Sequence, residues 1–487
     1  MINTLALKAP RSFWMILLFA SLWLANPAHA ATYNVTTYGA TGNGTTDDSQ
    51  AIANAIAAAN AAAGNTVLFP AGTYLIGSAS PKLQPKSITL QGGTNVVLNM
   101  TDSNAQIVAG SANTSFDGLT ISNTGSDKNS GLVFSTAKNG SVTNCTFNGW
   151  VNGIRANGSS GLKVKQNSFF MPKRETGILL QNASTATISK NKFASNSAGY
   201  GYGIFGDGSA NAITANNNSF DSLNYGFYSV GSNTVGSLSA SSNTFESCYY
   251  AFYLEGIYTT TVDSNTINNS SYAIYSFYNH FSTFTGNKIN SPVYAGFYVG
   301  LNKSGQTPVT MTNNTIANVG SGYYGMYLIG FAKAFNNTIS GASGASTGIY
   351  LYNINHTNSS FVDLEHNTLS GFQYGIYSSN SENVIASFNT ISNIQYSAYY
   401  GLLDEFDTIS GNTLKNCGLA SGAYAVIYVN PFFLGAYLKD TSITGNSYTG
   451  NSKNLSYYIY VNGHWYNANI SGNTTNTMLP TYPQYGD

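Results

Sequence analysis

The sequence has 487 residues, of which only 8% are charged, and its 19 basic residues are balanced by 19 acidic ones. Folded proteins usually carry about a quarter charged residues, so a basic nucleic-acid-binding surface and an acidic tail are both disfavoured. Hydrophobic residues make up 43% and aromatic residues 14% of the chain. This composition can build a large core, which disfavours disorder.

The first thirty residues have the pattern of a secretory signal peptide. Lys8 and Arg11 precede an apolar run over residues 13–25, and small residues follow around Ala30. The run is shorter than the roughly 20 apolar residues of a membrane-spanning helix, and we expect cleavage near Ala31. The sequence therefore predicts a protein without a membrane span that is secreted, periplasmic or held at the cell surface.

Residues 31–80 predict an N-terminal cap. An Ala-rich stretch over 49–63 carries isoleucines four residues apart and is expected to form an amphipathic helix. Asp47 and Asp48 directly precede it and are interpreted as N-cap residues rather than catalysts, and Gly64 is expected to end the helix. A strand and a Pro-Ala-Gly turn follow, so the helix could lie across the open end of a larger structure.

The same segment carries a family resemblance. The strings YGATGNGTTDD over 38–48 and FPAGTYLI over 69–76 resemble the opening of the pectate-lyase-like superfamily of right-handed parallel β-helices. The resemblance implies an all-β solenoid with an N-terminal capping α-helix. It also implies action on a polysaccharide, as in the lyases, hydrolases, alginate epimerases and phage tailspikes of that superfamily. The site patterns of polygalacturonases and alginate epimerases are absent, so no catalytic residue is carried over.

A repeat extends over residues 81–475, followed by a tail over 476–487. An Asn recurs mostly every 22–27 residues, between two apolar residues that alternate with polar ones. Such a period predicts a solenoid of about sixteen coils, with one repeat in each coil. We expect these Asn side chains to stack from coil to coil inside a turn: Asn167, Asn191, Asn218, Asn243, Asn265, Asn287, Asn314, Asn337, Asn367, Asn389, Asn412, Asn446 and Asn473.

The coil register predicts that the three cysteines are free and buried. Cys145 occupies a position equivalent to the recurring Asn, whereas Cys248 and Cys417 each lie five residues after one. With a rise of about 4.8 Å per coil, Cys145 and Cys248 are roughly 19 Å apart, and Cys248 and Cys417 roughly 34 Å. A disulfide needs Cα atoms within about 7 Å, so none is expected.

One strand of each repeat predicts an outward column of aromatic residues. A small residue and an inward apolar residue precede an outward position in each repeat. This position is occupied by Arg155, Leu179 and Phe205, and then by Tyr228, Tyr253, Tyr275, Tyr298, Tyr327, Tyr350, Tyr377, Tyr400, Tyr428 and Tyr460. The functional interpretation is a glycan track, with Tyr228, Tyr253, Tyr275, Tyr298 and Tyr327 as substrate-binding residues whose ring faces stack on sugars. The alternative is that strand propensity and aromatic stacking alone favour Tyr there.

Two positions beyond the column, Asp207 and Glu255 are expected two coils apart, about 10 Å. This is close to the separation of about 6.5–9.5 Å between the acid and base of inverting glycosidases. Lyases and epimerases of uronates instead need a cation and a base that takes the C5 proton. Arg155, Lys173 or Arg174 could neutralise the carboxylate, and Glu175, Glu255, Tyr228 or Tyr253 could act as the base. The alternative is a solvated charged patch without chemistry.

No His or Cys pair has metal-ligand spacing, so no metal or other cofactor is predicted. Asp404, Glu405 and Asp407 could hold calcium through oxygen ligands, although an ordinary polar loop is the favoured interpretation. Two functions remain open. The first is an exported lyase, hydrolase or epimerase acting on an acidic polysaccharide, and the second is a non-catalytic glycan-binding or adhesive protein that uses the tyrosine column.

Overall fold

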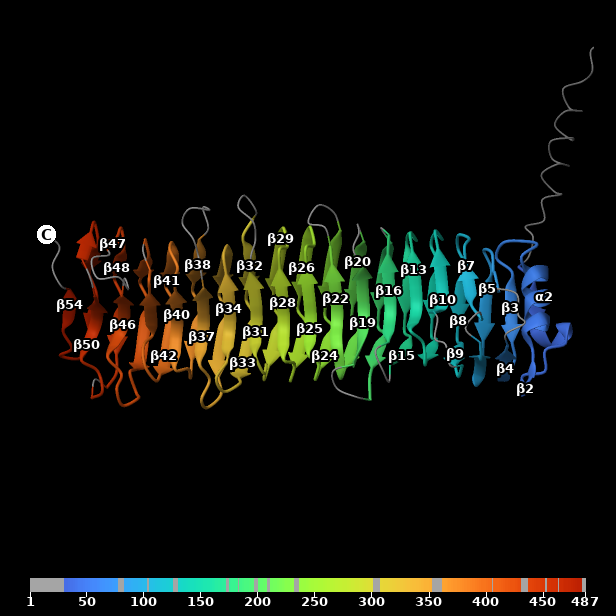
Figure 1. The fold of residues 1–487 in the computed structure, drawn as a ribbon, viewed down its shortest axis with the longest axis horizontal. Helices are drawn as coiled ribbons and strands as arrows, with labels where there is room; N and C mark the ends of the chain where they lie inside the picture. Colours follow the sequence, from blue (N-terminus) through green and yellow to red (C-terminus); the bar gives the residue numbers. More distant parts are fainter. Residues whose placement is uncertain are drawn as a thin grey trace, which may run out of the picture.

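The computed structural model describes residues 30–77, 83–102, 105–125, 130–171, 175–182, 184–196, 200–207, 211–231, 236–300, 307–352, 361–404, 406–430, 437–451, 453–462 and 464–483. The predicted signal peptide lies outside this part of the chain except for Ala30, and so do Lys173, Arg174 and Glu405. Over the described residues the chain winds into a right-handed parallel β-solenoid of about sixteen turns (Figure 1). The sequence resemblance and the predicted right-handed parallel β-solenoid are therefore confirmed.

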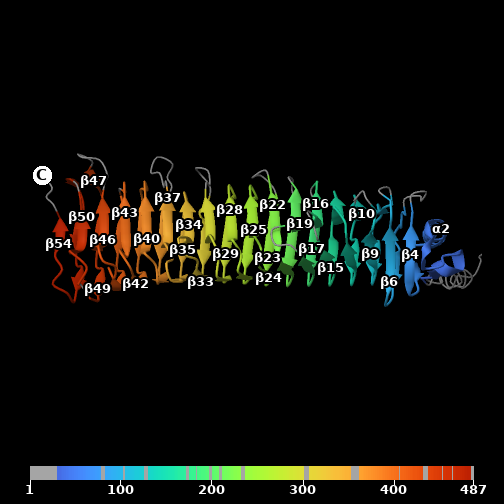
Figure 2. The ribbon, with the colours of Figure 1, turned by 60° about the horizontal axis from the view of Figure 1, so that its bottom comes forward.

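Each turn contributes one strand to each of three parallel sheets that run the length of the solenoid (Figure 2). The first sheet contains β1 (Thr32–Asn34), β3 (Thr66–Phe69), β5 (Thr89–Gly92), β8 (Ser115–Asp117), β11 (Ser141–Thr143), β14 (Leu162–Lys165), β17 (Thr185–Ser189), β20 (Ala212–Asn216), β23 (Ser237–Ser241), β26 (Thr259–Asp263), β29 (Phe281–Thr285), β32 (Val309–Thr312), β35 (Ala332–Phe335), β38 (Val362–Glu365), β41 (Val384–Ser387), β44 (Thr408–Ser410), β48 (Ser442–Thr444) and β52 (Asn469–Ser471). The second sheet contains β2 (Asn43–Asp47), β4 (Gly72–Ile76), β6 (Val96–Met100), β9 (Thr120–Asn123), β12 (Thr146–Asn148), β15 (Ser168–Phe170), β18 (Lys192–Ala194), β21 (Ser219–Asp221), β24 (Thr244–Glu246), β27 (Thr266–Asn268), β30 (Lys288–Asn290), β33 (Thr315–Val319), β36 (Thr338–Gly341), β39 (Thr368–Ser370), β42 (Thr390–Ile394), β45 (Thr413–Cys417), β49 (Ser447–Thr449) and β53 (Thr474–Thr475).

The third sheet presents the outward aromatic column. It contains β7 (Ile107–Ala109), β10 (Ser130–Ser135), β13 (Asn152–Asn157), β16 (Thr176–Gln181), β19 (Tyr200–Asp207), β22 (Leu223–Val230), β25 (Tyr250–Glu255), β28 (Tyr272–Phe277), β31 (Ala295–Gly300), β34 (Tyr324–Ile329), β37 (Thr347–Tyr352), β40 (Tyr374–Ser379), β43 (Tyr399–Leu402), β46 (Ala425–Asn430), β50 (Tyr457–Val461) and β54 (Thr481–Pro483). A separate pair, β47 (Tyr437–Lys439) and β51 (His464–Tyr466), lies beside the last turns.

The chain before the first complete turns contains a short 3₁₀ helix, η1 (Val35–Tyr38), and the helix α2 (Ser49–Ala59), which lies at the N-terminal end of the solenoid (Figure 1). The helix is four residues shorter than the sequence predicted, because the Asn65 side chain donates to the carbonyl of Ala59 and the chain turns there. Among the described residues, no helix is long and apolar enough to cross a bilayer.

The two aspartates before the helix accept hydrogen bonds from other backbone groups than those expected for N-cap residues. Asp48 occupies the N-cap position, but its buried carboxylate accepts hydrogen bonds from the backbone N–H groups of Thr41 and Gly42 and makes no bond to the helix. Asp47 accepts the N–H of Ser49 instead. The amides of the preceding loop thus take the carboxylate that the sequence pattern assigned to the helix.

The recurring Asn residues form a continuous buried ladder between the first and second sheets, as the sequence predicted. The backbone N–H of Asn314 donates to Oδ1 of Asn337 at 2.9 Å, and the Asn314 side-chain amide donates to the same oxygen at 2.9 Å. That amide also donates to the Phe284 carbonyl on the preceding turn at 2.9 Å. The same three bonds recur along the solenoid, so each corner satisfies its buried polar groups through the next.

The cysteines follow the predicted register. Cys145 occupies the ladder position in the turn before Asn167, and its backbone N–H donates to Oδ1 of Asn167 at 2.8 Å. Cys145, Cys248 and Cys417 are all free and buried. Burial raises the pKa of each thiol to about 12, so the thiols are protonated and unreactive at neutral pH.

Candidate functional site

Ten tyrosine rings form one unbroken stack along the outer face of the third sheet, and we call this stack the tyrosine ladder. Consecutive ladder residues are directly paired in the sheet, which confirms the predicted register. Adjacent ring centroids are 4.6–5.3 Å apart in the order Tyr228, Tyr253, Tyr275, Tyr298, Tyr327, Tyr350, Tyr377, Tyr400, Tyr428 and Tyr460.

The ring faces in the ladder are occupied by one another. Neighbouring planes lie within 22° of parallel, except between Tyr377 and Tyr400, where the angle is 40°. The ladder therefore presents ring edges and hydroxyls along most of its length, not the free ring faces that the sequence interpretation assumed. Burial raises the pKa of the phenols, to about 12 for Tyr275 and for Tyr377, so they remain neutral hydrogen-bonding groups at physiological pH.

A second column of tyrosines, which the sequence analysis missed, flanks the ladder. Tyr202, Tyr225, Tyr250 and Tyr272 lie three residues before the ladder position and stack on one another at 4.9–5.1 Å. The same position is occupied by Tyr324, Tyr374 and Tyr457 in later turns. The repeated pattern Tyr-x-x-Tyr in the sequence would have revealed this column, because two consecutive buried residues separate the two tyrosines and both rings therefore reach the same surface. We call these seven residues the second column.

Asp207 and Glu255 lie at the end of their strands in the predicted register. Val230 pairs with Asp207 on one side and with Glu255 on the other, so the Cα atoms of the two acidic residues are separated by two strand spacings, about 10 Å. Asp207 is exposed and Glu255 half-buried. Between them, burial and the nearby charges of both carboxylates raise the pKa of the Tyr228 phenol. The Tyr253 hydroxyl donates to Oε2 of Glu255 at 3.1 Å.

A hydrogen-bonded chain connects the predicted cation to the acidic pair. Nε of Arg155 donates to Oε1 of Gln181 at 3.0 Å, and Nε2 of Gln181 donates to Oδ2 of Asp207 at 2.7 Å. Gln181 was not singled out by the sequence analysis, because an isolated Gln has no recognisable pattern. The structure thus groups Asp207, Glu255 and the first two ladder tyrosines. Arg155 lies two turns before Asp207 and four turns before Glu255, roughly 19 Å from the latter, and reaches Asp207 only through Gln181.

The remaining predicted catalytic residues lie elsewhere or outside the described chain. Glu175 is buried just before β16, whereas Gln181, the neighbour of Asp207, ends that strand. Six extended residues separate them by roughly 20 Å, so Glu175 does not join the acidic pair. Lys173 and Arg174 lie outside the described residues.

The predicted calcium residues Asp404 and Asp407 are fully buried and face Tyr399. The Tyr399 hydroxyl donates to Oδ2 of Asp407 at 2.9 Å, and the backbone N–H groups of Ser381 and Val384 donate to the two carboxyls. Burial raises the pKa of both carboxyls, to about 7 for Asp407. Glu405 lies outside the described residues.

The fold and its outward ladder define a parallel β-helix protein of the pectate-lyase-like class. A family model described as "Rhamnogalacturonase A/epimerase, pectate lyase-like" matches residues 32–253. A second, described as "Periplasmic copper-binding protein (NosD)", matches residues 198–319 and 236–482. The latter match spans more than half of the 487 residues, so the chain belongs to the NosD family. No curated protein sequence is significantly similar to the chain.

Solved structures with the same fold include tailspike proteins of E. coli bacteriophage HK620. A tailspike mutant in complex with a pentasaccharide has a TM-score of 0.53 and 13% sequence identity, and the match covers 90% of this chain and 80% of the tailspike chain. The tailspike protein in complex with a pentasaccharide has a TM-score of 0.50 and 12% identity, and covers 91% and 80%. At this level of identity the likeness establishes the fold.

The described residues contain no cluster of His, Cys, Asp or Glu that matches the copper in the family description. Copper sites in proteins use clustered His, Cys and Met ligands. The described part of the chain has no group of three His, Cys, Asp or Glu residues that could hold a metal ion. All three cysteines are buried as protonated thiols on different turns.

Proposed function

We propose that the protein binds a polysaccharide along the tyrosine ladder, outside the cytoplasm. The observation that carries this proposal is the unbroken stack of ten outward phenols on one rigid sheet. The stack presents a row of neutral hydroxyls and apolar ring edges, which suits the alternating polar and apolar surface of a glycan. The predicted signal peptide and the periplasmic family description support the location. The oligosaccharides bound by the tailspike neighbours support the ligand class.

A second candidate function, cleavage of the bound glycan, is favoured by Asp207 and Glu255 at the N-terminal end of the ladder. A separation of about 10 Å leaves room for a water molecule between a sugar and the second carboxylate. In this arrangement one carboxyl group protonates the departing glycosidic oxygen and the other carboxylate activates the water, with inversion at the anomeric carbon. The bond from Tyr253 to Glu255 holds the second carboxylate in place.

Binding is tested by affinity electrophoresis and a glycan array with the purified protein. The double variant Tyr253→Ala plus Tyr275→Ala removes two ladder rings that are both half-buried, and we expect it to weaken binding at least tenfold. A matched control, Phe170→Ala, removes an exposed aromatic ring from the second sheet and should bind as the wild type does. Equal binding by all three proteins would refute the ladder as the binding surface.

Cleavage is tested on the glycans that bind. Release of reducing ends without ultraviolet absorbance indicates hydrolysis, whereas absorbance from an unsaturated uronate indicates a lyase. We expect Asp207→Asn and Glu255→Gln each to reduce hydrolysis by at least a hundredfold while binding is retained. If activity is unchanged in both variants, the acidic pair is not catalytic; if no product forms from any bound glycan, the protein is a binding protein only.

A further inference from the structure

The second column covers the ladder in a regular way. Each of its rings from Tyr225 to Tyr374 contacts the ladder ring of its own turn and that of the next turn. Tyr250, for example, is 5.4 Å from Tyr253 and 5.5 Å from Tyr275, measured between ring centroids. Tyr374 is likewise 5.2 Å from Tyr377 and 5.1 Å from Tyr400. Where a second-column ring is present, it therefore covers one side of two successive ladder rings.

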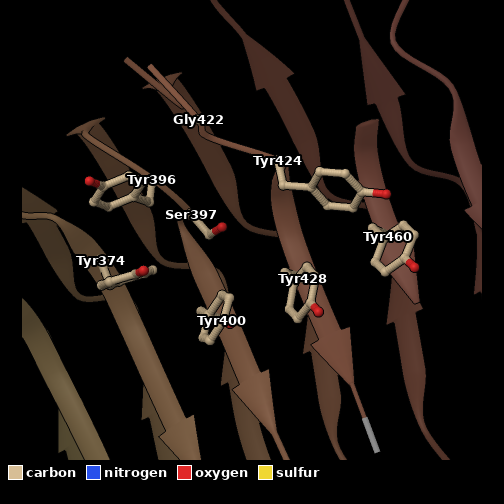
Figure 3. Close-up of a pocket in the computed structure, with 8 residues that line it drawn as sticks. All are labelled: Tyr374, Tyr396, Ser397, Tyr400, Gly422, Tyr424, Tyr428 and Tyr460. Atoms are coloured by element: carbon tan, nitrogen blue, oxygen red, sulfur yellow. The ribbon is translucent and has the colours of Figure 1, made fainter. Parts of the chain in front are cut away.

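The turn after Tyr374 has no ring at this position, and its Tyr396 stacks on Tyr374 instead, with ring centroids 5.3 Å apart. Ser397 lies three residues before Tyr400, in the position that Tyr374 occupies before Tyr377, and its hydroxyl donates to the Ala425 carbonyl at 2.7 Å. A hollow of about 450 Å³ opens above it, beside Tyr400 and Tyr428 (Figure 3). Tyr374 and Tyr396 border one side of the hollow, and Tyr424 and Tyr460 border the other.

A second hollow of about 580 Å³ adjoins the first, and Tyr396 lines both. Its polar side chains are the hydroxyls of Ser343 and Tyr396 and the amides of Gln373, Asn393 and Gln395. None of the residues lining either hollow carries a charge. Amides donate and accept hydrogen bonds, as sugar hydroxyls do, whereas a uronate would require a cation for its carboxylate.

We propose that the hollow above Ser397 is a subsite for one uncharged pyranose ring, and that the amide-lined hollow holds the next sugar of the same chain. The missing second-column ring leaves a space bordered by aromatic rings, where the apolar face of a pyranose replaces a phenol. The ring of Tyr424 is 42% exposed and therefore available for contact. This inference rests on the proposed glycan binding. It locates the strongest contact between protein and glycan at the last ladder rings, and it assigns the ligand to the uncharged glycans.

The variant Ser397→Tyr tests the subsite by restoring the ring that other turns carry. Its matched control is Thr347→Tyr, which adds a ring at the same strand position two turns earlier. Affinities for cellohexaose, xylohexaose, mannohexaose and hexagalacturonate are measured by titration calorimetry with the full-length protein. We expect at least one neutral probe to bind the wild type and Thr347→Tyr alike, and to bind Ser397→Tyr at least tenfold more weakly.

Tyr424→Ala provides an independent test, because it removes one wall of the hollow and fills nothing. We expect this variant, and Gln395→Ala in the neighbouring hollow, to weaken the neutral probe several-fold. If a neutral probe binds and neither Ser397→Tyr nor Tyr424→Ala changes its affinity by more than twofold, the subsite is refuted while glycan binding stands. Binding of hexagalacturonate alone overturns the neutral assignment. If none of the four probes binds the wild type, both proposals fail.

Discussion

The buried Asn ladder provides the sharpest test of what holds the solenoid together, through the variant Asn314→Ala. Oδ1 of Asn314 accepts the backbone N–H of Asn287 at 2.9 Å and its side-chain amide at 3.0 Å. The Asn314 amide donates to the Phe284 carbonyl and to Asn337. Alanine removes these bonds and leaves the buried N–H of Asn287 without an acceptor. A buried unsatisfied group costs about 1–3 kcal/mol, so we expect a loss of about 3–5 kcal/mol in the free energy of unfolding.

The measurement is guanidinium unfolding followed by circular dichroism, with hydrogen exchange to locate the weakened turns. Asn473→Ala is the matched control, because Asn473 is the last ladder residue and is only half-buried. We expect it to lose about 1 kcal/mol. Asn314→Asp should lower the free energy of unfolding more than Asn314→Ala does, because it turns a carboxylate oxygen towards two hydrogen-bond acceptors. An effect of Asn314→Ala below about 1 kcal/mol, or equal to that of Asn473→Ala, would refute the reasoning.

Two further predictions concern buried titratable groups. The native protein should show no thiol that reacts with Ellman's reagent at pH 8, because burial raises the pKa of each thiol to about 12. The denatured protein should show three reactive thiols. A reactive thiol in the native protein would contradict the predicted coil register. The folded-state pKa of Asp407 is raised to about 7, so its protonated form favours folding, and stability should fall as the pH rises from about 4 through 7. Asp407→Asn should therefore melt at a higher temperature than the wild type at pH 8.5 and at a similar one at pH 5. A wild-type melting temperature that is unchanged between these pH values would contradict this sign.

The repeat was accessible from the sequence because it depends on local and periodic properties. An Asn that recurs in each turn with apolar residues two positions later can satisfy its amide only by stacking on the next turn, and the structure shows this for Asn167 through Asn473. The outward tyrosine register followed for the same reason, since side chains alternate between the two faces of a strand.

The orientation of side chains between turns was decided by the tertiary structure. The strand period places Tyr253 and Tyr275 on one face, but only packing turns their rings face to face, at 4.8 Å and 10° from parallel. Depth likewise depends on the whole fold: Asp404 and Asp407 appeared to be a polar loop, but they are enclosed below the surface. Glu175 is close in sequence to the predicted cations, yet the length of its strand separates it from Asp207.

The sequence by itself determined the solenoid, its Asn ladder, its free cysteines and the face that carries the tyrosines, because each of these follows from the spacing of residue types along the chain. Only the tertiary structure decided where that face is closed and where it is open. Whether Ser397 leaves a hollow depends on which rings of neighbouring turns reach over it, and spacing alone does not specify that geometry.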